Sequence, residues 1–382
     1  MIEIIQVANQ RDKQAFLKFP YKLYQADPLW VPPIFAEREH QTDPARGKFF
    51  TYGEADFFLA YKNGKLAGTI CPHHEHTGGK DEALIGFFEC IEDPEVASAL
   101  FDTAREWART RGFTKLIGTY NMDREDGRGI LIEGRDRPPV VLCGHNPPYY
   151  PAFFEQYGFG KYGMDGLAYA RDLEDSSAEV RRLYQLAERV AQRRNFTLRH
   201  ADLSHIDREV DVILELQNQA LKHLDGHPYS RETIESMVLP FVQIADPELV
   251  IFVEHEGKSI GWFPGVPNIN ELLIHLNGLR TPLDYLKGWY YQRQQPKCVA
   301  VKSVALLPEY WDTGAAILMF AEMARRAIVK GYKWIDLSVT GEDNPDTWDL
   351  AHNMGAKIYK RYRFYQIPVD QQEPTSRSTS IT

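Results

Sequence analysis

Residues 302–316 read Lys302-Ser303-Val304-Ala305-Leu306-Leu307-Pro308-Glu309-Tyr310-Trp311-Asp312-Thr313-Gly314-Ala315-Ala316, and they carry the most specific fold signal in the chain. The order of residue types predicts a strand, then a turn, then a helix that opens on small residues. Small residues at that place let a ligand approach the backbone closely. The unpaired N–H groups of a helix start, together with the helix macrodipole, favour an anion. The stretch therefore predicts a site for a pyrophosphate.

The elements around this stretch follow an α/β order. Upstream we expect helices over 180–194, with Ser177 as N-cap, and 205–223; strands over 196–200 and 272–276; and a hairpin of 250–254 with 259–263 around Glu256-Gly257. Downstream we expect a strand over 299–306, a helix over 314–330, a strand over 334–339, a short helix over 347–354 and a last strand over 358–369.

The first half of the chain repeats this order. It predicts strands over 2–7, 83–90, 116–118 and 140–143, helices over 10–25, 94–111 and 150–157, a loop over 124–137, and a hairpin of 57–61 with 66–70 around Asn63-Gly64. Three segments match in order between the halves: 59–68 with 252–261, 108–117 with 327–336, and 154–159 with 351–356. The matches predict two tandem units of one α/β type.

The stretch 302–316 resembles the signature of the GNAT acyltransferase family, which is Arg/Gln-x-x-Gly-x-Gly/Ala after a strand that ends in an apolar residue and Pro. Gly314 and Ala316 match the signature, while Trp311 stands where the family has Arg or Gln. The resemblance implies an α/β (α+β) protein of two tandem GNAT folds with mixed central sheets flanked by helices. We expect these domains at 1–172 and 173–369, followed by a disordered tail over 370–382.

The resemblance implies that the second domain binds acetyl-CoA or another acyl-CoA as co-substrate. The pantetheine arm would lie where the strand before the phosphate loop splays from the next strand, with the acyl carbonyl near a backbone N–H at Leu306. The binding residues carried over are Leu306, Leu307, Trp311, Asp312, Thr313, Gly314, Ala315, Ala316 and Asn344. Trp311 lacks a charge-assisted hydrogen bond of roughly 1.5–3 kcal/mol, which predicts weaker or rearranged phosphate contacts.

Catalytic groups are harder to assign. The family often uses a Tyr as the acid four residues before the Gly of the last turn, and Ala351 and Phe154 hold that place here. We take Tyr310 as a candidate acid, with His352 and Tyr359 also near. Asp336 and Ser338 share one face of their strand and are candidate bases, although a solvated or helix-capping Asp336 is the simpler interpretation.

The first domain lacks a phosphate loop. Between its strand and helix stand Glu92, Asp93 and Glu95, which cap the helix and repel a pyrophosphate. Its aromatic segments 27–33 and 146–150 either shape a substrate pocket or serve only in packing.

Composition limits the remaining functions. The chain has 382 residues, 43% of them hydrophobic, and a net charge of −9, which argues against a nucleic-acid partner. No apolar run of about 18 residues suits a membrane span, and four scattered cysteines are typical of a reducing compartment, so we expect a cytoplasmic protein without a membrane partner. The run Cys71-Pro72-His73-His74-Glu75-His76 favours a polar loop, and no metal site is expected.

These observations predict an acyl-CoA-dependent N-acyltransferase that acts on the amine of a small molecule or peptide. A homodimer is compatible with the sequence. Two alternatives stay open: a non-catalytic GNAT-like protein that binds acyl-CoA or a partner, and an aminoacyl-tRNA-dependent transferase with paired GNAT-like units.

Overall fold

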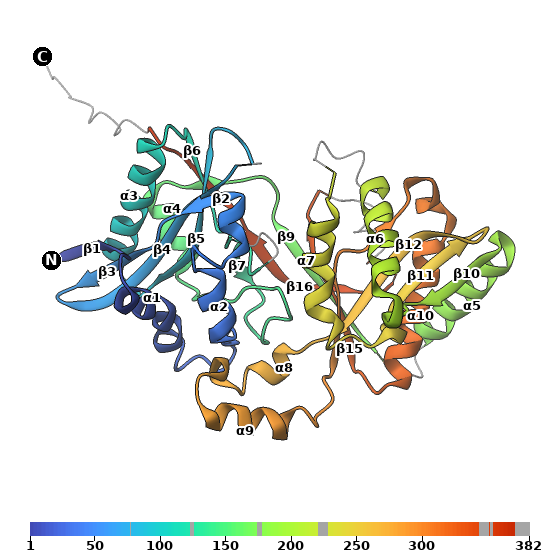
Figure 1. Ribbon diagram of the computed structural model, residues 1–382. Coiled ribbons are helices and arrows are strands. Elements are labelled where there is room, and N and C mark those ends of the chain that lie inside the picture. The colour runs from blue at the N-terminus through green and yellow to red at the C-terminus, as the bar shows by residue number, and fades with distance from the viewer. Residues whose placement is uncertain are drawn as a thin grey trace, which may run out of the picture. The chain divides into compact units, whose positions relative to one another are not determined.

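The computed structural model describes residues 1–76, 78–122, 126–173, 178–220, 228–343, 351 and 354–370. The chain forms two compact units (Figure 1). Unit 1 comprises Met1–Asp165, Leu273–Lys287 and the chain from Tyr362 onward, and unit 2 comprises Gly166–Leu272 and Gly288–Arg361. Each unit has a mixed sheet with flanking helices, which confirms the predicted fold class. No described helix is long and apolar enough to span a membrane.

Unit 1 is built on a sheet in the order β1-β3-β4-β5-β6-β17-β8, with β2 paired to β4. Its strands are β1 (Ile2–Gln6), β2 (Gly53–Ala55), β3 (Phe58–Lys62), β4 (Lys65–Glu75), β5 (Glu82–Cys90), β6 (Lys115–Gly118), β8 (Gly160–Lys161) and β17 (Tyr365–Pro368). Its helices are α1 (Gln10–Leu23), α2 (Phe35–Gln41), α3 (Pro94–Thr110) and α4 (Tyr150–Tyr157), and β7 (Ile130–Glu133) also belongs to this part of the chain.

Helix α3 shows how the sequence positions these elements. Asp93 caps its first turn, Pro94 occupies the first helical position, and Gly112 follows its end with φ +81°. Its apolar stripe is buried against the sheet, with Leu100, Phe101, Ala104, Trp107 and Ala108 in the core of unit 1.

Unit 2 contains a sheet in the order β10-β11-β12-β13-β15-β9-β16, with β14 paired to β12. Its strands are β9 (Gly166–Asp172), β10 (Phe196–His200), β11 (Val250–His255), β12 (Lys258–Pro267), β13 (Cys298–Val301), β14 (Ala305–Leu306), β15 (Trp334–Gly341) and β16 (Lys357–Arg363). Its helices are α5 (Ala178–Arg194), α6 (Ile206–Ala220), α7 (Arg231–Val242) and α10 (Ala315–Val329). Helices α8 (Asn270–Leu273) and α9 (Pro282–Tyr291) contain the borders between the units, with residues 273 and 282–287 in unit 1.

The sequence did not predict the sheet pairing of two strands, β9 and β17. Strand β9 lies antiparallel to β15 in unit 2, and β17 lies antiparallel to β6 in unit 1. The predicted single strand over 358–369 is therefore wrong, because β16 and β17 are separate strands in different sheets. The units also differ from the predicted ranges 1–172 and 173–369, since backbone pairing rather than chain order decides which unit a strand joins.

Other differences have local causes. Residues 140–143 form a turn rather than a strand, with Leu142 at φ +66°, and β7 lies instead inside the predicted loop over 124–137. Residues 272–276 are the end of α8 and a turn, because Leu276 N–H donates to Leu273 O. The predicted strand over 299–306 is broken into β13 and β14. Ser177, the tail beyond residue 370 and most of the predicted helix over 347–354 lie outside the described residues.

Candidate functional site

The sheet of unit 2 forks at the predicted phosphate loop. Strand β13 runs parallel to β15 from Cys298↔Trp334 to Val301↔Leu337, whereas β14 pairs with β12. The pairing with β15 ends just before Ser303, which adopts φ +53°. The Ser303 carbonyl accepts a 2.9 Å hydrogen bond from Gln217. The splay implied by the family resemblance is therefore present in the backbone.

Strand β14 leaves the backbone N–H and C=O of Leu306 unpaired with β12. Leu307 N–H donates to Ile260 O on β12 at 3.0 Å. Because consecutive residues of an antiparallel strand bond on alternate sides, the N–H and C=O of Leu306 point away from β12. The carbonyl of Leu306 accepts a 2.9 Å hydrogen bond from the indole Nε1 of Trp311, so Trp311 fixes the turn to the strand.

A short 3-10 turn, Pro308–Thr313, leads from the fork to α10. Gly314 joins them at φ +87°, in the left-handed region that favours glycine. Thr313 Oγ1 donates to Tyr310 O at 2.6 Å and accepts a long contact of 3.4 Å from Ala315 N–H. Ala316 and Ile317 lie in the first turn of α10, where backbone amides have no partner within the helix. These two half-buried donors at the start of a 15-residue helix suit an anion.

Gly314 also serves in helix packing. Helix α5 packs along α10, and a Cβ placed on Gly314 would lie 2.8 Å from Val190 Cγ2. A small residue at 314 is therefore required by α5 as well as by the left-handed φ. The exposed side chain of Asp312 precedes the amides, so the loop carries a carboxylate of its own.

The candidate base Asp336 is neither solvated nor a helix cap. Its side chain on β15 is fully buried. Lys302 Nζ lies 2.9 Å from Oδ2, and Tyr359 OH donates to Oδ1 at 2.7 Å. A buried carboxylate requires such partners because desolvation of the charge is otherwise costly. The structure therefore places Asp336 in a polar cluster where the two strands begin to diverge.

Of the other predicted catalytic residues, Tyr310 lies away from this cluster. The phenol oxygen of Tyr310 lies 3.1 Å from His255 Nδ1, and its ring packs edge-on against Phe196. Ser338 belongs to β15, but its side chain lies outside the described residues, as does Asn344. Tyr359, by contrast, contacts Asp336 from β16.

In unit 1, the backbone amides at the start of α3 are capped by the side chain of Asp93. Asp93 Oδ1 accepts hydrogen bonds from the amides of Glu95 and Val96 at 3.1 and 3.4 Å. Lys62 Nζ lies 2.5 Å from Asp93 and 2.9 Å from Glu95. This capping arrangement follows the acidic pattern of the sequence, and it opposes a second anion at this helix.

Unit 1 contains a carboxyl group that sequence reasoning missed. Glu89 Oε2 accepts hydrogen bonds from Tyr24 OH at 2.7 Å and Tyr150 OH at 2.8 Å. Burial raises the pKa of Glu89 to about 7, although the two tyrosine hydrogen bonds favour the carboxylate. A carboxyl group with this pKa can act as acid or base near neutral pH. The available signal was one acidic residue inside the apolar strand over 83–90.

The two aromatic segments of unit 1 pack around this carboxyl group. Trp30 stacks on Tyr24 with ring centroids 4.9 Å apart. Tyr149 OH donates to Cys90 O at 2.9 Å, next to the Tyr150–Glu89 contact. His145 Nε2 lies 2.7 Å from Asp27 Oδ2, close to the Tyr24 ring. The segments therefore build the surroundings of Glu89.

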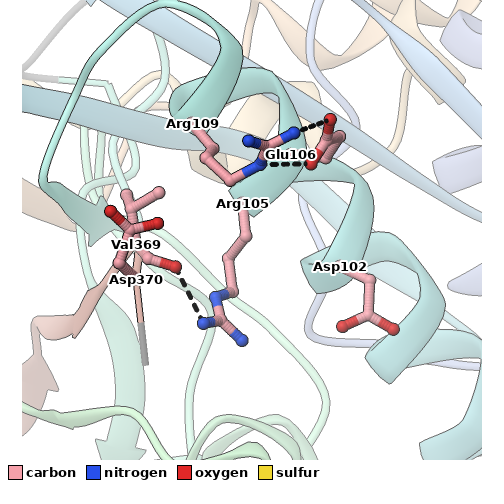
Figure 2. A pocket seen from close by; sticks show the side chains of 6 residues that line it. All are labelled: Asp102, Arg105, Glu106, Arg109, Val369 and Asp370. Atoms are coloured by element: carbon pink, nitrogen blue, oxygen red, sulfur yellow. Dashed lines mark hydrogen bonds and ion pairs between the residues drawn. The ribbon is translucent and has the colours of Figure 1, made fainter. Parts of the chain in front are cut away.

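A polar depression of about 290 Å³ lies on the surface of unit 1 (Figure 2). It is lined by Asp102, Arg105, Glu106, Arg109, Val369 and Asp370. Arg109 pairs with Glu106 at 2.7 Å, and Arg105 donates to Val369 O at 2.8 Å. Arg109 and Glu106 thus pair with each other, whereas among the described residues Arg105 Nε is buried without a hydrogen-bond partner.

Comparisons with known proteins cover the whole chain. No family model matches it. It is 30% identical over 377 residues to protein YghO of Escherichia coli, covering 94% of this chain and 93% of that protein. It is 28% identical over 379 residues to the bacterial ceramide synthase of Caulobacter vibrioides, covering 96% of this chain and 97% of that protein.

Two solved structures resemble both units. A tandem GNAT protein from the clavulanic acid biosynthesis pathway matches with a TM-score of 0.57 and 13% identity, covering 98% of this chain and all (100%) of that chain. A GCN5-related N-acetyltransferase from Sphaerobacter thermophilus matches with a TM-score of 0.52 and 13% identity, covering 96% of each chain. These likenesses show a tandem GNAT fold, in agreement with the forked sheet and the loop before α10, and the 30% identity over 94% of the chain shows that it belongs to one family with protein YghO.

Proposed function

We propose that the protein is an acyl-CoA-dependent N-acyltransferase and that unit 2 binds the acyl-CoA. The observation that carries the proposal is the fork between β14 and β15, which leads into α10, a helix whose first turn presents the Ala316 and Ile317 amides. A pyrophosphate supplies the oxygens that such amides bind. The fork suits an extended pantetheine chain, and the Leu306 N–H, directed away from β12, suits the thioester carbonyl.

The proposed reaction forms an amide bond and breaks a thioester. The amine nitrogen attacks the carbonyl carbon, the C–S bond breaks, and the thiolate leaves while the nitrogen loses one proton. Asp336 is the proposed proton acceptor, held in place by Lys302 at 2.9 Å. Tyr359 OH, 2.7 Å from Asp336, is the proposed proton donor to the thiolate and links the two transfers. Orientation of the amine and thioester supplies much of the rate in such a reaction.

The acceptor that we propose is a long-chain amine. The support is the similarity to the bacterial ceramide synthase, which extends over 96% of this chain and includes both units. The amide bond of a ceramide is the bond that an N-acyltransferase forms.

A product assay tests this function. The purified protein is incubated with acetyl-CoA and with longer acyl-CoAs, each with a sphingoid base, a short polyamine or a lysine peptide, and N-acyl products are measured by mass spectrometry. We expect product with the sphingoid base, and we expect Tyr359→Phe to lower its turnover by about tenfold to a hundredfold while leaving acyl-CoA affinity unchanged.

The alternatives give different outcomes. Saturable acyl-CoA binding without product from any amine would indicate a binding protein. Transfer from an aminoacyl-tRNA, without transfer from acyl-CoA, would indicate the tRNA-dependent class. Tyr359→Phe activity equal to that of the wild type would remove Tyr359 from the mechanism.

A further inference from the structure

Helix α9, which lies between β12 and β13 in the sequence, is labelled in Figure 1. It exposes an unusual set of side chains. Five large apolar or aromatic residues on this one helix are each 54% to 62% exposed: Leu283, Tyr285, Leu286, Trp289 and Tyr290. We call them the α9 face. Within the described chain they account for five of the thirteen exposed large hydrophobic residues, although α9 has only ten residues. Such concentration differs from the single exposed hydrophobics that are normal on a protein surface.

The orientation of α9 is the reverse of that of an ordinary surface helix. A surface helix normally buries its apolar stripe and exposes its polar one. Here Leu283, Leu286 and Tyr290, which share a stripe at i, i+3 and i+7, face outward. The inward group includes Asp284, which is 3% exposed and accepts hydrogen bonds from the amides of Arg280 and Thr281 at 3.1 and 2.9 Å.

The hydrogen bonds of Asp284 determine which side of α9 faces outward. Asp284 Oδ2 also accepts from Thr281 Oγ1 at 2.9 Å, so three donors of the preceding turn hold the carboxylate against the start of the helix. Turning the apolar stripe inward would bring this carboxylate out and break these bonds. The α9 face is therefore fixed toward the outside by the polar side of the same helix.

The charge around α9 contrasts with that of the whole chain. Residues 280–297 contain four basic residues, Arg280, Lys287, Arg293 and Lys297, and the single acidic residue Asp284, in a chain of net charge −9. The Arg293 guanidinium lies 3.7 Å from the centre of the Trp289 ring, which places a cation directly beside the apolar face. Lys287 is exposed next to Leu286.

We propose that the α9 face docks on an anionic lipid bilayer. Trp and Tyr rings with Leu side chains and flanking cations are the composition of a helix that lies in the headgroup region. The cations beside the α9 face complement lipid phosphates. An anionic bilayer presents such phosphates over its whole surface, which a second copy of this chain does not. We expected no membrane partner because no segment of the sequence is apolar enough to span a membrane. Docking through one short helix on the bilayer surface requires no spanning segment.

Vesicle co-sedimentation of the full chain tests the proposal. The vesicles are phosphatidylcholine alone, or phosphatidylcholine mixed with phosphatidylglycerol, at low and high salt. We expect binding to the mixed vesicles that weakens with salt. We expect the double variant Leu286→Glu, Trp289→Glu to weaken binding on the order of tenfold or more. It removes apolar surface that docking would bury, and its two carboxylates are repelled by the anionic lipids.

Val329→Glu is the matched control, since Val329 is 77% exposed on α10 and lies outside the α9 face. It should bind like the wild type, and circular dichroism should show that both variants are folded. Equal binding by the double variant, or no binding of the wild type to either vesicle, would overturn the proposal. So would a concentration-dependent dimer that the double variant abolishes without vesicle binding, because the α9 face would then be a contact between copies.

Discussion

Lys302 Nζ and Asp336 Oδ2 lie 2.9 Å apart at the base of the fork in unit 2. The pair joins the residue just before the bend at Ser303, between β13 and β14, to β15, the strand from which β14 diverges. Asp336 is fully buried, whereas 14% of the Lys302 side chain reaches solvent. The pair therefore ties together the two strands whose separation defines the proposed acyl-CoA site.

Breaking this pair should be costly. Lys302→Met leaves the buried Asp336 carboxylate without its cation, and we expect a loss of about 3 kcal/mol in the free energy of unfolding. Asp336→Asn should cost less in the Lys302→Met background than in the wild type, by at least about 1 kcal/mol. Urea unfolding of the four proteins measures this coupling. Arg109→Met, which breaks an exposed pair with Glu106, is the control and should change little. Additive effects of the two substitutions would show that the pair contributes no coupling.

Glu89 should make stability depend on pH. Its pKa is raised from 4.5 to about 7 in the folded chain, so the folded state holds a proton that the unfolded state releases. Folding is therefore disfavoured increasingly as pH rises through that window, and the penalty is constant above it. Glu89→Gln removes the titration, so its stability relative to the wild type should rise between about pH 4.5 and pH 7.

Unfolding free energies measured across that range test this. Tyr24→Phe is the companion variant: it removes a hydrogen bond that lowers the pKa of Glu89 in the folded chain, so the upper end of the window should move to higher pH while its lower end stays in place. Parallel curves for wild type and Glu89→Gln would contradict the assigned pKa.

Gly314 should tolerate no side chain, for two separable reasons. Gly314→Ala places a Cβ at φ +87° and 2.8 Å from Val190 Cγ2, and we expect a loss of about 2–3 kcal/mol. In a Val190→Ala background the loss should fall to about 1 kcal/mol, the cost of the left-handed φ. Gly257→Ala is the matched control, because Gly257 has φ +78° with open space around its Cβ position. Thermal unfolding compares them, and an equal loss in both backgrounds would exclude the Val190 contact as a cause.

The sequence predicts well where structure is local. The hairpins at Asn63-Gly64 and Glu256-Gly257 form as expected, with positive φ at all four residues, because two adjacent residues determine the turn. The end of α4 at Gly158 and the break before α10 at Gly314 follow from the same conformational preference. The family resemblance also located the fork, since the signature lies within 15 consecutive residues, 302–316.

Nonlocal pairing was not predictable from the sequence pattern. Nothing in the alternation of 166–172 or 365–368 indicates that β9 pairs with β15 or that β17 pairs with β6. The partners of Asp336 were missed for a similar reason, because Lys302 and Tyr359 are 34 and 23 residues away in the chain. Glu89 resembled an ordinary exposed position of a strand, and only the fold brings Tyr24 and Tyr150 to it.

The most direct test of the central claim is a calorimetric titration of long-chain acyl-CoA into the wild type and Ala316→Pro. Proline is tolerated in the first turn of a helix, so this substitution removes one proposed phosphate donor while the helix is retained. We expect saturable binding by the wild type and affinity lower by about tenfold or more in the variant, with an unchanged unfolding temperature. Absence of binding to the wild type, or equal affinity in both proteins, would contradict acyl-CoA binding at the start of α10.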